Sequence, residues 1–152
     1  MNAVTLLEEE HRELKRLLRD LEPTTERAVK TRAELYERIH RALTAHEQIE
    51  EEIFYPALKE HPKARDIVLE GIEEHGVVDS LLRELEDVAV DDETWGPKAR
   101  VMIENIEHHI EEEEDDMFVK ARQVFEPAEL KALGAAMATR RAELLAEEGA
   151  RR

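Results

Sequence analysis

Hydrophobic residues recur along most of the chain at intervals of three and four, the spacing of one face of an α-helix. Prolines and turn residues divide this pattern into five segments. The predicted helices cover residues 2–22, from 25 or 31 to 58, 62–88, 97–124 and 127–148, and VAVDDETWGPK forms a loop before the fourth. Because four long helices with short connections favour alternating directions, we predict an all-α, antiparallel up-down-up-down four-helix bundle with a C-terminal fifth helix.

The composition agrees with this fold. Only 5 glycines and 5 prolines occur among 152 residues, and 39% of the residues are charged. A mixture rich in Glu, Lys, Arg, Ala and Leu favours helix, and this length suits one hydrophobic core. We expect residues 1–125 to form the bundle domain and residues 126–152 a helical extension, which either packs across the bundle or serves a partner.

The chain carries a formal net charge of −16. Such an acidic surface repels nucleic acids and anionic membranes, so we expect neither as a partner. No apolar run approaches the ~20 residues of a membrane span, and the N-terminal stretch lacks the pattern of a signal peptide. We therefore expect a cytoplasmic protein, and the sequence leaves its oligomeric state open.

Each of the four predicted bundle helices places one histidine on its core face. These histidines are His11, His46, His75 and His109. Glu50 and Glu113 follow two of them by one turn on the same face, and Asp79 follows His75 in the equivalent place. A buried carboxylate without a partner costs several kcal/mol, and a cation between two such groups removes that cost. The pattern therefore predicts a metal site in the bundle core.

Two stretches of the chain repeat the same motif 63 residues apart. Residues 45–57 read AHEQIEEEIFYPA and residues 108–120 read HHIEEEEDDMFVK. With His46 set over His109, each stretch has His, three residues, Glu-Glu, two residues and a hydrophobic pair. His108 lies one position off, on a more polar face, so we favour His109 as the ligand.

Each histidine alone has a simpler interpretation. One histidine on an apolar face is commonly a hydrogen-bonded core residue, and a His–Glu pair four residues apart occurs on helix surfaces. The coincidence of four histidines on four core faces favours metal binding. Imidazole and carboxylate ligands suit Fe, Mn or Zn, and two bridging carboxylates suit a metal pair ~3.5–4 Å apart. The chain has no cysteine, which excludes thiolate ligands and disulfides.

These residues resemble the hemerythrin-like, or HHE cation-binding, domain family, in its bacterial H…HxxxE…H…HxxxE branch. The resemblance covers about residues 3–125. The chain supplies the motif as His11, then His46-Glu47-Gln48-Ile49-Glu50, then His75, then His109-Ile110-Glu111-Glu112-Glu113. It implies a four-helix bundle around a non-heme di-iron centre, with two Fe ions and with Mn or Zn as alternatives.

The resemblance also implies a role for each residue. The four histidines become terminal ligands, Glu50 and Glu113 become bridging ligands, and Glu47 becomes an occasional extra ligand or a group that supports one. Asp79 stands where the oxygen-carrying hemerythrins have another histidine, and it is a further possible ligand. The last helix also has HxxxE where those proteins have HxxxxD. Four histidines instead of five leave coordination positions open to a small ligand.

The resemblance implies a protein that binds or reacts with O2, peroxide or NO, in scavenging, sensing or iron handling. A catalase-like or peroxidase-like activity is one form of this function. A ferritin-like carboxylate oxidase is an alternative, because the chain contains Glu8-x-x-His11 and Glu37-x-x-His40, but the third and fourth helices lack that motif. A metal-free helical interaction module is another. Metal-bound imidazoles usually donate their second N–H to an oxygen, for which the candidates are Tyr36, Tyr55 and Glu47.

Overall fold

The computed structural model describes residues 1–150, which are helical apart from short connections and contain no strand. The four bundle helices are α1 (Ala3–Leu21), α2 (Val29–Ile49), α4 (Arg65–Glu86) and α5 (Trp95–Glu112). The shorter elements are η1 (Glu50–Phe54), α3 (Tyr55–Lys59), η2 (Pro62–Ala64), η3 (Glu113–Met117) and α6 (Phe118–Val124), and α7 (Pro127–Ala150) completes the chain. The predicted all-α bundle with a fifth helix is confirmed.

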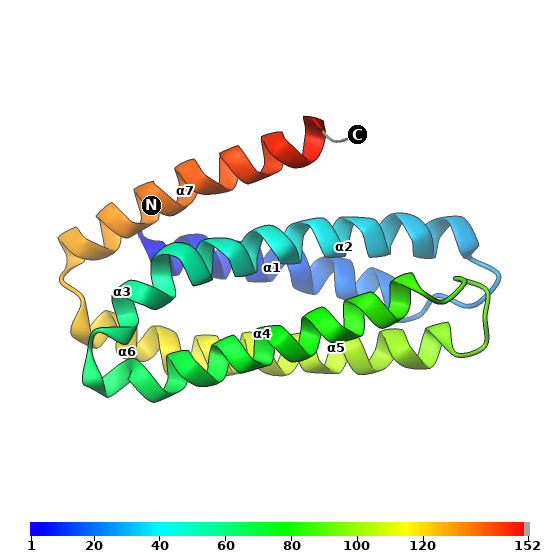
Figure 1. The fold of residues 1–152 in the computed structure, drawn as a ribbon, viewed down its shortest axis with the longest axis horizontal. Coiled ribbons are helices and arrows are strands. Elements are labelled where there is room, and N and C mark those ends of the chain that lie inside the picture. Colours follow the sequence, from blue (N-terminus) through cyan, green and yellow to red (C-terminus); the bar gives the residue numbers. More distant parts are fainter. Residues whose placement is uncertain (151–152) are drawn as a thin grey trace.

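The bundle consists of two helical hairpins that lie side by side (Figure 1). Helices α1 and α2 form one hairpin, and α4 and α5 form the other. Helix α7 packs on the outside of α1 and α2, so within the described chain the fifth helix covers the bundle. No helix of residues 1–150 combines the length and the apolar character that crossing a membrane requires.

Helix α7 approaches the start of α1 very closely at Gly134. A Cβ atom on Gly134 would overlap the carbonyl oxygen of Met1 and lie 2.7 Å from the carbonyl carbon of Asn2. Asn2 also caps α1, because its side chain accepts a hydrogen bond from the backbone N–H of Thr5 at 2.9 Å. Only glycine at position 134 therefore fits this contact between the fifth helix and the N-terminus.

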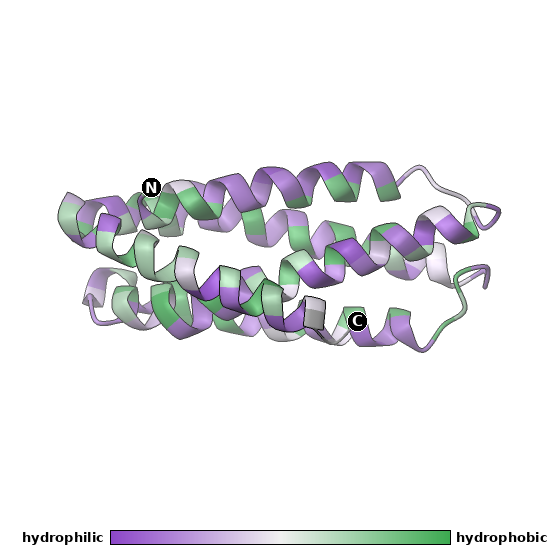
Figure 2. Ribbon diagram, turned by 90° about the horizontal axis from the view of Figure 1, so that it is seen from above, coloured by the Kyte–Doolittle hydropathy of each residue, from purple (hydrophilic) through white to green (hydrophobic). Residues whose placement is uncertain are grey.

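The hydrophobic core consists of two clusters at the two ends of the bundle. One includes Leu7, Phe54 and Phe118, and the other includes Leu14 and Trp95. Hydrophobic and polar residues alternate along the bundle helices, as the helical pattern predicts (Figure 2). On α1, His11 stands between Leu7 of the first cluster and Leu14 of the second. The buried polar residues thus form a layer between two apolar regions.

Two π-helical turns interrupt the long helices, and the sequence pattern did not predict them. The backbone N–H of Tyr55 bonds to the carbonyl oxygen of Glu50, five residues back, and that of Phe118 bonds likewise to Glu113. Each turn therefore holds one residue more than an α-helix would. Both π segments begin at a core-facing glutamate of the repeated motif.

The extra residue changes which side chains face the core after Glu50. Ile53 and Ala57, which follow Glu50 at helical spacing, pack against the core but are only partly buried. Tyr55 and Leu58 are buried instead. The π turn rotates the residues that follow it by one position. Tyr55 is thereby directed into the polar layer.

Candidate metal centre

Six predicted residues converge in the polar layer, in two groups of three. The first group is His11, His46 and Glu113, and the second is Glu50, His75 and His109. Within each group one potential ligand atom per residue lies within 4.8 Å of the others. All six residues are at most 4% exposed. The core thus contains two adjacent sets of nitrogen and oxygen donors, each able to hold a metal ion.

The Nε2 atoms of the four histidines point at the two central carboxylates. His11 Nε2 lies 3.0 Å from Glu113 Oε1, and His75 Nε2 lies 3.1 Å from Glu50 Oε1. His46 Nε2 lies 3.2 Å from Glu50 Oε1, and His109 Nε2 lies 3.6 Å from Glu113 Oε1. Each glutamate therefore lies close to histidines of both groups, as a bridging ligand requires.

Three of these inward atoms have no hydrogen-bond partner: His46 Nε2, His109 Nε2 and Glu50 Oε2. Buried polar atoms without partners are rare, because each costs about 1–3 kcal/mol. A metal ion coordinated by these atoms would remove that cost. The donor set therefore fits a cation that binds nitrogen and oxygen, such as iron, manganese or zinc.

The outer nitrogen of each imidazole faces a second carboxylate. Nδ1 lies 2.8 Å from Glu114 in His11, 2.8 Å from Glu10 in His46 and 2.7 Å from Glu74 in His109. Nδ1 of His75 lies 3.3 Å from Glu51. When the carboxylates beside His11, His46 and His109 accept the Nδ1–H, these neutral imidazoles present the lone pair of Nε2 to the centre. The longer contact between His75 and Glu51 is not a hydrogen bond.

The sequence analysis did not identify these four carboxylates. They share one property. Each is the sequence neighbour of one converging residue, and each faces a histidine that belongs to a different helix. Glu10 precedes His11, Glu74 precedes His75, Glu51 follows Glu50 and Glu114 follows Glu113. An acidic neighbour beside these four of the six core-facing residues was the available signal, although the many glutamates of the chain obscure it.

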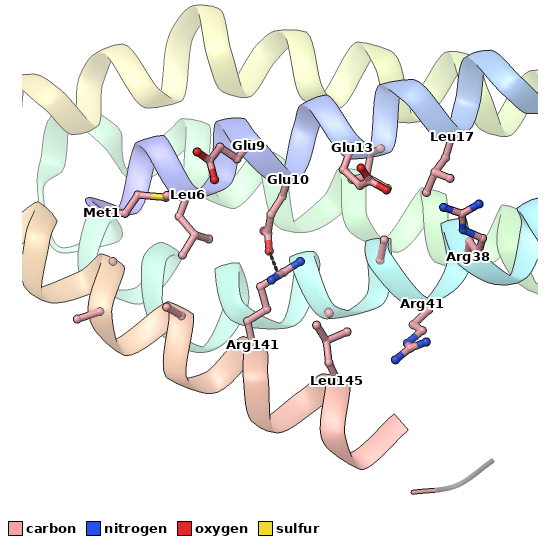
Figure 3. A pocket seen from close by; sticks show the side chains of 16 residues that line it. Met1, Leu6, Glu9, Glu10, Glu13, Leu17, Arg38, Arg41, Arg141 and Leu145 are labelled. Atoms are coloured by element: carbon pink, nitrogen blue, oxygen red, sulfur yellow. Dashed lines mark ion pairs between the residues drawn. The ribbon is translucent and has the colours of Figure 1, made fainter. Parts of the chain in front are cut away.

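Helix α7 contacts one of these supporting carboxylates. Arg141 Nε lies 2.6 Å from Glu10 Oε2, while the other oxygen of Glu10 accepts from His46 (Figure 3). Arg140, its neighbour, lies 2.9 Å from Glu52 in the π segment η1. The fifth helix is thus connected to the polar layer by an ion pair and a hydrogen bond.

The charges of the layer are strongly unbalanced toward carboxylates. Burial lowers the pKa of His11, but its hydrogen bonds with Glu113 and Glu114 outweigh burial and raise that pKa above its usual value. The pKa of the other three histidines is raised in the same way, against burial, by facing carboxylates. Burial disfavours ionised Glu113, yet the surrounding histidines hold its pKa well below the usual range. Six carboxylates around four imidazoles form an environment that attracts cations.

Tyr55 reaches the middle of this layer from the π segment. Its hydroxyl donates to Glu113 Oε2 at 2.7 Å and lies 3.3 Å from His75 Nε2. Burial, followed by the charges of Glu113 and Glu50, raises the pKa of Tyr55 well above its usual value, so the hydroxyl keeps its proton. Gly71 on α4 provides the space, because a Cβ there would lie 3.0 Å from the Tyr55 hydroxyl. Of the three candidates Tyr36, Tyr55 and Glu47, Tyr55 is the one whose side chain donates a hydrogen bond to one of the six residues.

Glu47 and Asp79, the two additional ligands that the resemblance implies, lie beside the two groups of three and belong to neither. Burial and then a hydrogen bond with Asp79 raise the pKa of Glu47 to about 10. Glu47 instead groups with Glu51 and His75, with ligand atoms within 4.8 Å of one another. Tyr36 lies elsewhere, since its hydroxyl donates to the carbonyl oxygen of Leu82 at 2.8 Å.

The structure also distinguishes the remaining histidines. The side chain of His108 is 64% exposed, whereas His109 is buried and faces the centre. His40 is partly exposed and pairs with Glu86 at 3.3 Å, and Glu8 pairs with Arg122 on the surface at 3.0 Å. The two Glu-x-x-His motifs therefore do not assemble the carboxylate-rich site of a ferritin-like oxidase.

Comparison with known proteins identifies the family to which this fold belongs. The family model for the hemerythrin HHE cation binding domain matches residues 2–121. A solved structure, the hemerythrin HHE cation binding domain-containing protein from Mycobacterium kansasii that is homologous to Rv2633c, is 28% identical, with a TM-score of 0.84. The likeness covers 95% of this chain and 87% of that one. A comparison with curated proteins gives no match. The chain belongs to the hemerythrin HHE cation-binding domain family.

Proposed function

We propose that the protein holds a non-heme di-iron centre and that this centre binds or reacts with O2, peroxide or NO, peroxide being the ligand we favour. The observation that carries the proposal is the pair of buried donor groups in which Glu50 and Glu113 each lie close to histidines of both groups, with three inward atoms left without hydrogen bonds. In this proposal the four histidines are terminal ligands and the two glutamates are bridging ligands. The choice of iron rests on the resemblance to the hemerythrin-like family.

The residues of the chain prepare this centre for a small ligand. The carboxylates on Nδ1 hold each imidazole in one orientation, and the apolar clusters on both sides exclude bulk water. When bound, iron supplies reversible redox chemistry and open coordination positions. Tyr55 keeps its proton and donates a hydrogen bond to Glu113, so it holds this carboxylate in position beside Glu50 and His75.

Peroxide is favoured because its disproportionation balances without another reactant. Two molecules of hydrogen peroxide give two of water and one of O2, so one peroxide supplies the electrons that the other accepts. The chain has no cysteine and hence no thiol that could act as an internal reductant. A reaction that needs no external reductant is the simplest that this small domain can complete alone.

The test measures iron per chain, the absorption spectrum and O2 release from peroxide in the wild type, His109→Ala and His108→Ala. We expect about two irons in the wild type and in His108→Ala, since two bridging carboxylates suit a metal pair. We expect loss of iron and of O2 release in His109→Ala. Iron-free protein from iron-rich cultures, with His109→Ala unchanged in stability, would instead support a helical interaction module. Two irons without O2 release would refute peroxide decomposition and direct the assay to O2 and NO.

A further inference from the structure

A pocket lies between α4 and the segment formed by α2 and η1, directly beside the buried centre. It has a volume of about 530 Å³ and is lined by carboxylates of both helices: Glu47, Glu51, Asp79 and Glu86. The cationic groups that line it are Arg83 and His40, and His40 is already paired with Glu86 at 3.3 Å. Even with Glu47 protonated, the remaining three carboxylates outnumber the one arginine, so the wall of this pocket is negative.

Two buried atoms next to this pocket lack partners. Glu47 is 5% exposed and His75 is 2% exposed, yet neither Glu47 Oε1 nor His75 Nδ1 has a hydrogen-bond partner. Both belong to the group in which Glu47, Glu51 and His75 bring ligand atoms within 4.8 Å. Asp79 adds a further carboxylate through its hydrogen bond with Glu47. Uncompensated donors of this kind are expected where a cation binds.

Glu51 connects this pocket to the centre. Its side chain is 43% exposed, whereas the other three supporting carboxylates are 10–28% exposed. Its Oε2 lies 3.3 Å from Nδ1 of His75, whose Nε2 faces Glu50 in the centre. His75 is therefore the residue of the centre that a cation in the pocket would meet first.

We propose that this pocket, which we call the vestibule, is a separate binding site for a hydrated divalent cation, held by Glu47, Glu51 and Asp79 on its way to the buried centre. Carboxylates that keep a cation partly hydrated bind it loosely enough to release it. Focusing of cations by a negative cleft also raises the rate of their capture. The role of the vestibule in loading rests on the metal centre proposed above. Its ability to bind a cation does not depend on that centre.

The test uses the double variant Glu47→Gln/Asp79→Asn, in which two carboxylates become amides of nearly the same size. Neither residue supports a histidine of the centre, and Glu51 stays in place. Glu104→Gln/Glu107→Gln is the control, because it replaces two carboxyl groups by amides on the exposed face of α5, outside the vestibule. Thermal unfolding of the metal-free proteins checks the fold, and Asp79→Asn alone serves if the double variant is unfolded.

The first measurement is the rate at which metal-free protein takes up Fe2+ in the absence of oxygen. A chelator added at successive times stops the uptake, and the iron bound to the protein is then determined. We expect loading at least about tenfold slower in the double variant than in the control, the lower end of electrostatic rate gains, with the same final iron content. The second is electron paramagnetic resonance of Mn2+ added to iron-loaded protein. We expect one additional Mn2+ in the wild type and the control, and none in the double variant.

Equal loading rates in the double variant and the control would overturn the proposal. So would the absence of the additional Mn2+ from the wild type, or its retention in the double variant. The iron content of each preparation is determined before Mn2+ is added. A failure of the buried centre is thus recorded separately from a failure of the vestibule.

Discussion

Replacing Tyr55 by phenylalanine isolates one hydrogen bond of the buried layer. The hydroxyl of Tyr55 donates to Glu113 at 2.7 Å, and both side chains are 1% exposed. A hydrogen bond to a charged group contributes about 1.5–3 kcal/mol, and its loss leaves a buried carboxylate oxygen without that donor. For the metal-free protein we expect Tyr55→Phe to lower the free energy of unfolding by about 2 kcal/mol, or the Tm by about 4–8 °C.

Tyr36→Phe provides the matched control. The Tyr36 hydroxyl donates to the carbonyl oxygen of Leu82 at 2.8 Å, in a partly exposed position where water can replace the lost donor. We therefore expect a loss of about 1 kcal/mol or less from this variant. Urea unfolding followed by circular dichroism measures both losses, and unchanged m-values show that the two states remain comparable.

Iron changes the expected result for Tyr55→Phe in a definite direction. If Glu113 binds metal, the metal compensates its charge, so the loss should be smaller in iron-loaded protein than in metal-free protein. A Tyr55→Phe variant as stable as the wild type when metal-free, or less affected than Tyr36→Phe, would refute the reasoning about the buried layer. An equal loss with and without iron would argue against Glu113 as a ligand.

Three further predictions follow from the site and from helix α7. Glu74→Gln should weaken iron binding about 10–100-fold, as loss of a carboxylate behind a metal-bound histidine does, whereas Glu73→Gln on the exposed face should not; competition with a chelator measures both. Gly134→Ala should lower the Tm, because its Cβ meets the backbone of Met1. Gly76→Ala has open space around its Cβ and should stabilise α4 by about 0.5–1 kcal/mol. Thermal scans in which both variants shift the Tm in the same direction would contradict this prediction. The raised histidine pKa values stabilise the metal-free fold below pH 6.5, and this contribution is lost as pH rises. The Tm difference between iron-loaded and metal-free protein should therefore widen from pH 5 to pH 8. A constant or shrinking difference in calorimetry would contradict the assignment of the four histidines as metal ligands.

The sequence was sufficient to place the six converging residues because the helices are regular up to each of them. On α1, α2, α4 and α5 the steps of three and four hold, so His11 and His75, for example, fall in line with buried leucines and valines. An error of one residue in the assumed rotation of the helix would have selected His108 instead of His109. The repeated motif prevented that error. Regular geometry and a repeat were thus the two sources of the prediction.

The same reasoning failed where regular geometry ends. No residue type marks a π turn, and EEEIF and EEDDM look like ordinary glutamate-rich helix, so the rotation of Tyr55 into the centre could not be predicted. The supporting carboxylates were missed for a different reason. With 38 acidic residues in the chain, only the tertiary positions of the helices decide that Glu10 reaches His46 and Glu74 reaches His109.

Each group of three donors combines histidines of one hairpin with a glutamate of the other. His11 and His46 come from the first hairpin and group with Glu113, which follows the second, while Glu50 follows the first hairpin and groups with the histidines of the second. During synthesis on the ribosome, therefore, one group lacks a member until residue 109 has been made and the other until residue 113, and both also require the two hairpins to meet. Metal binding would then act as a report of completed folding, because a half-finished chain offers a cation only fragments of either group.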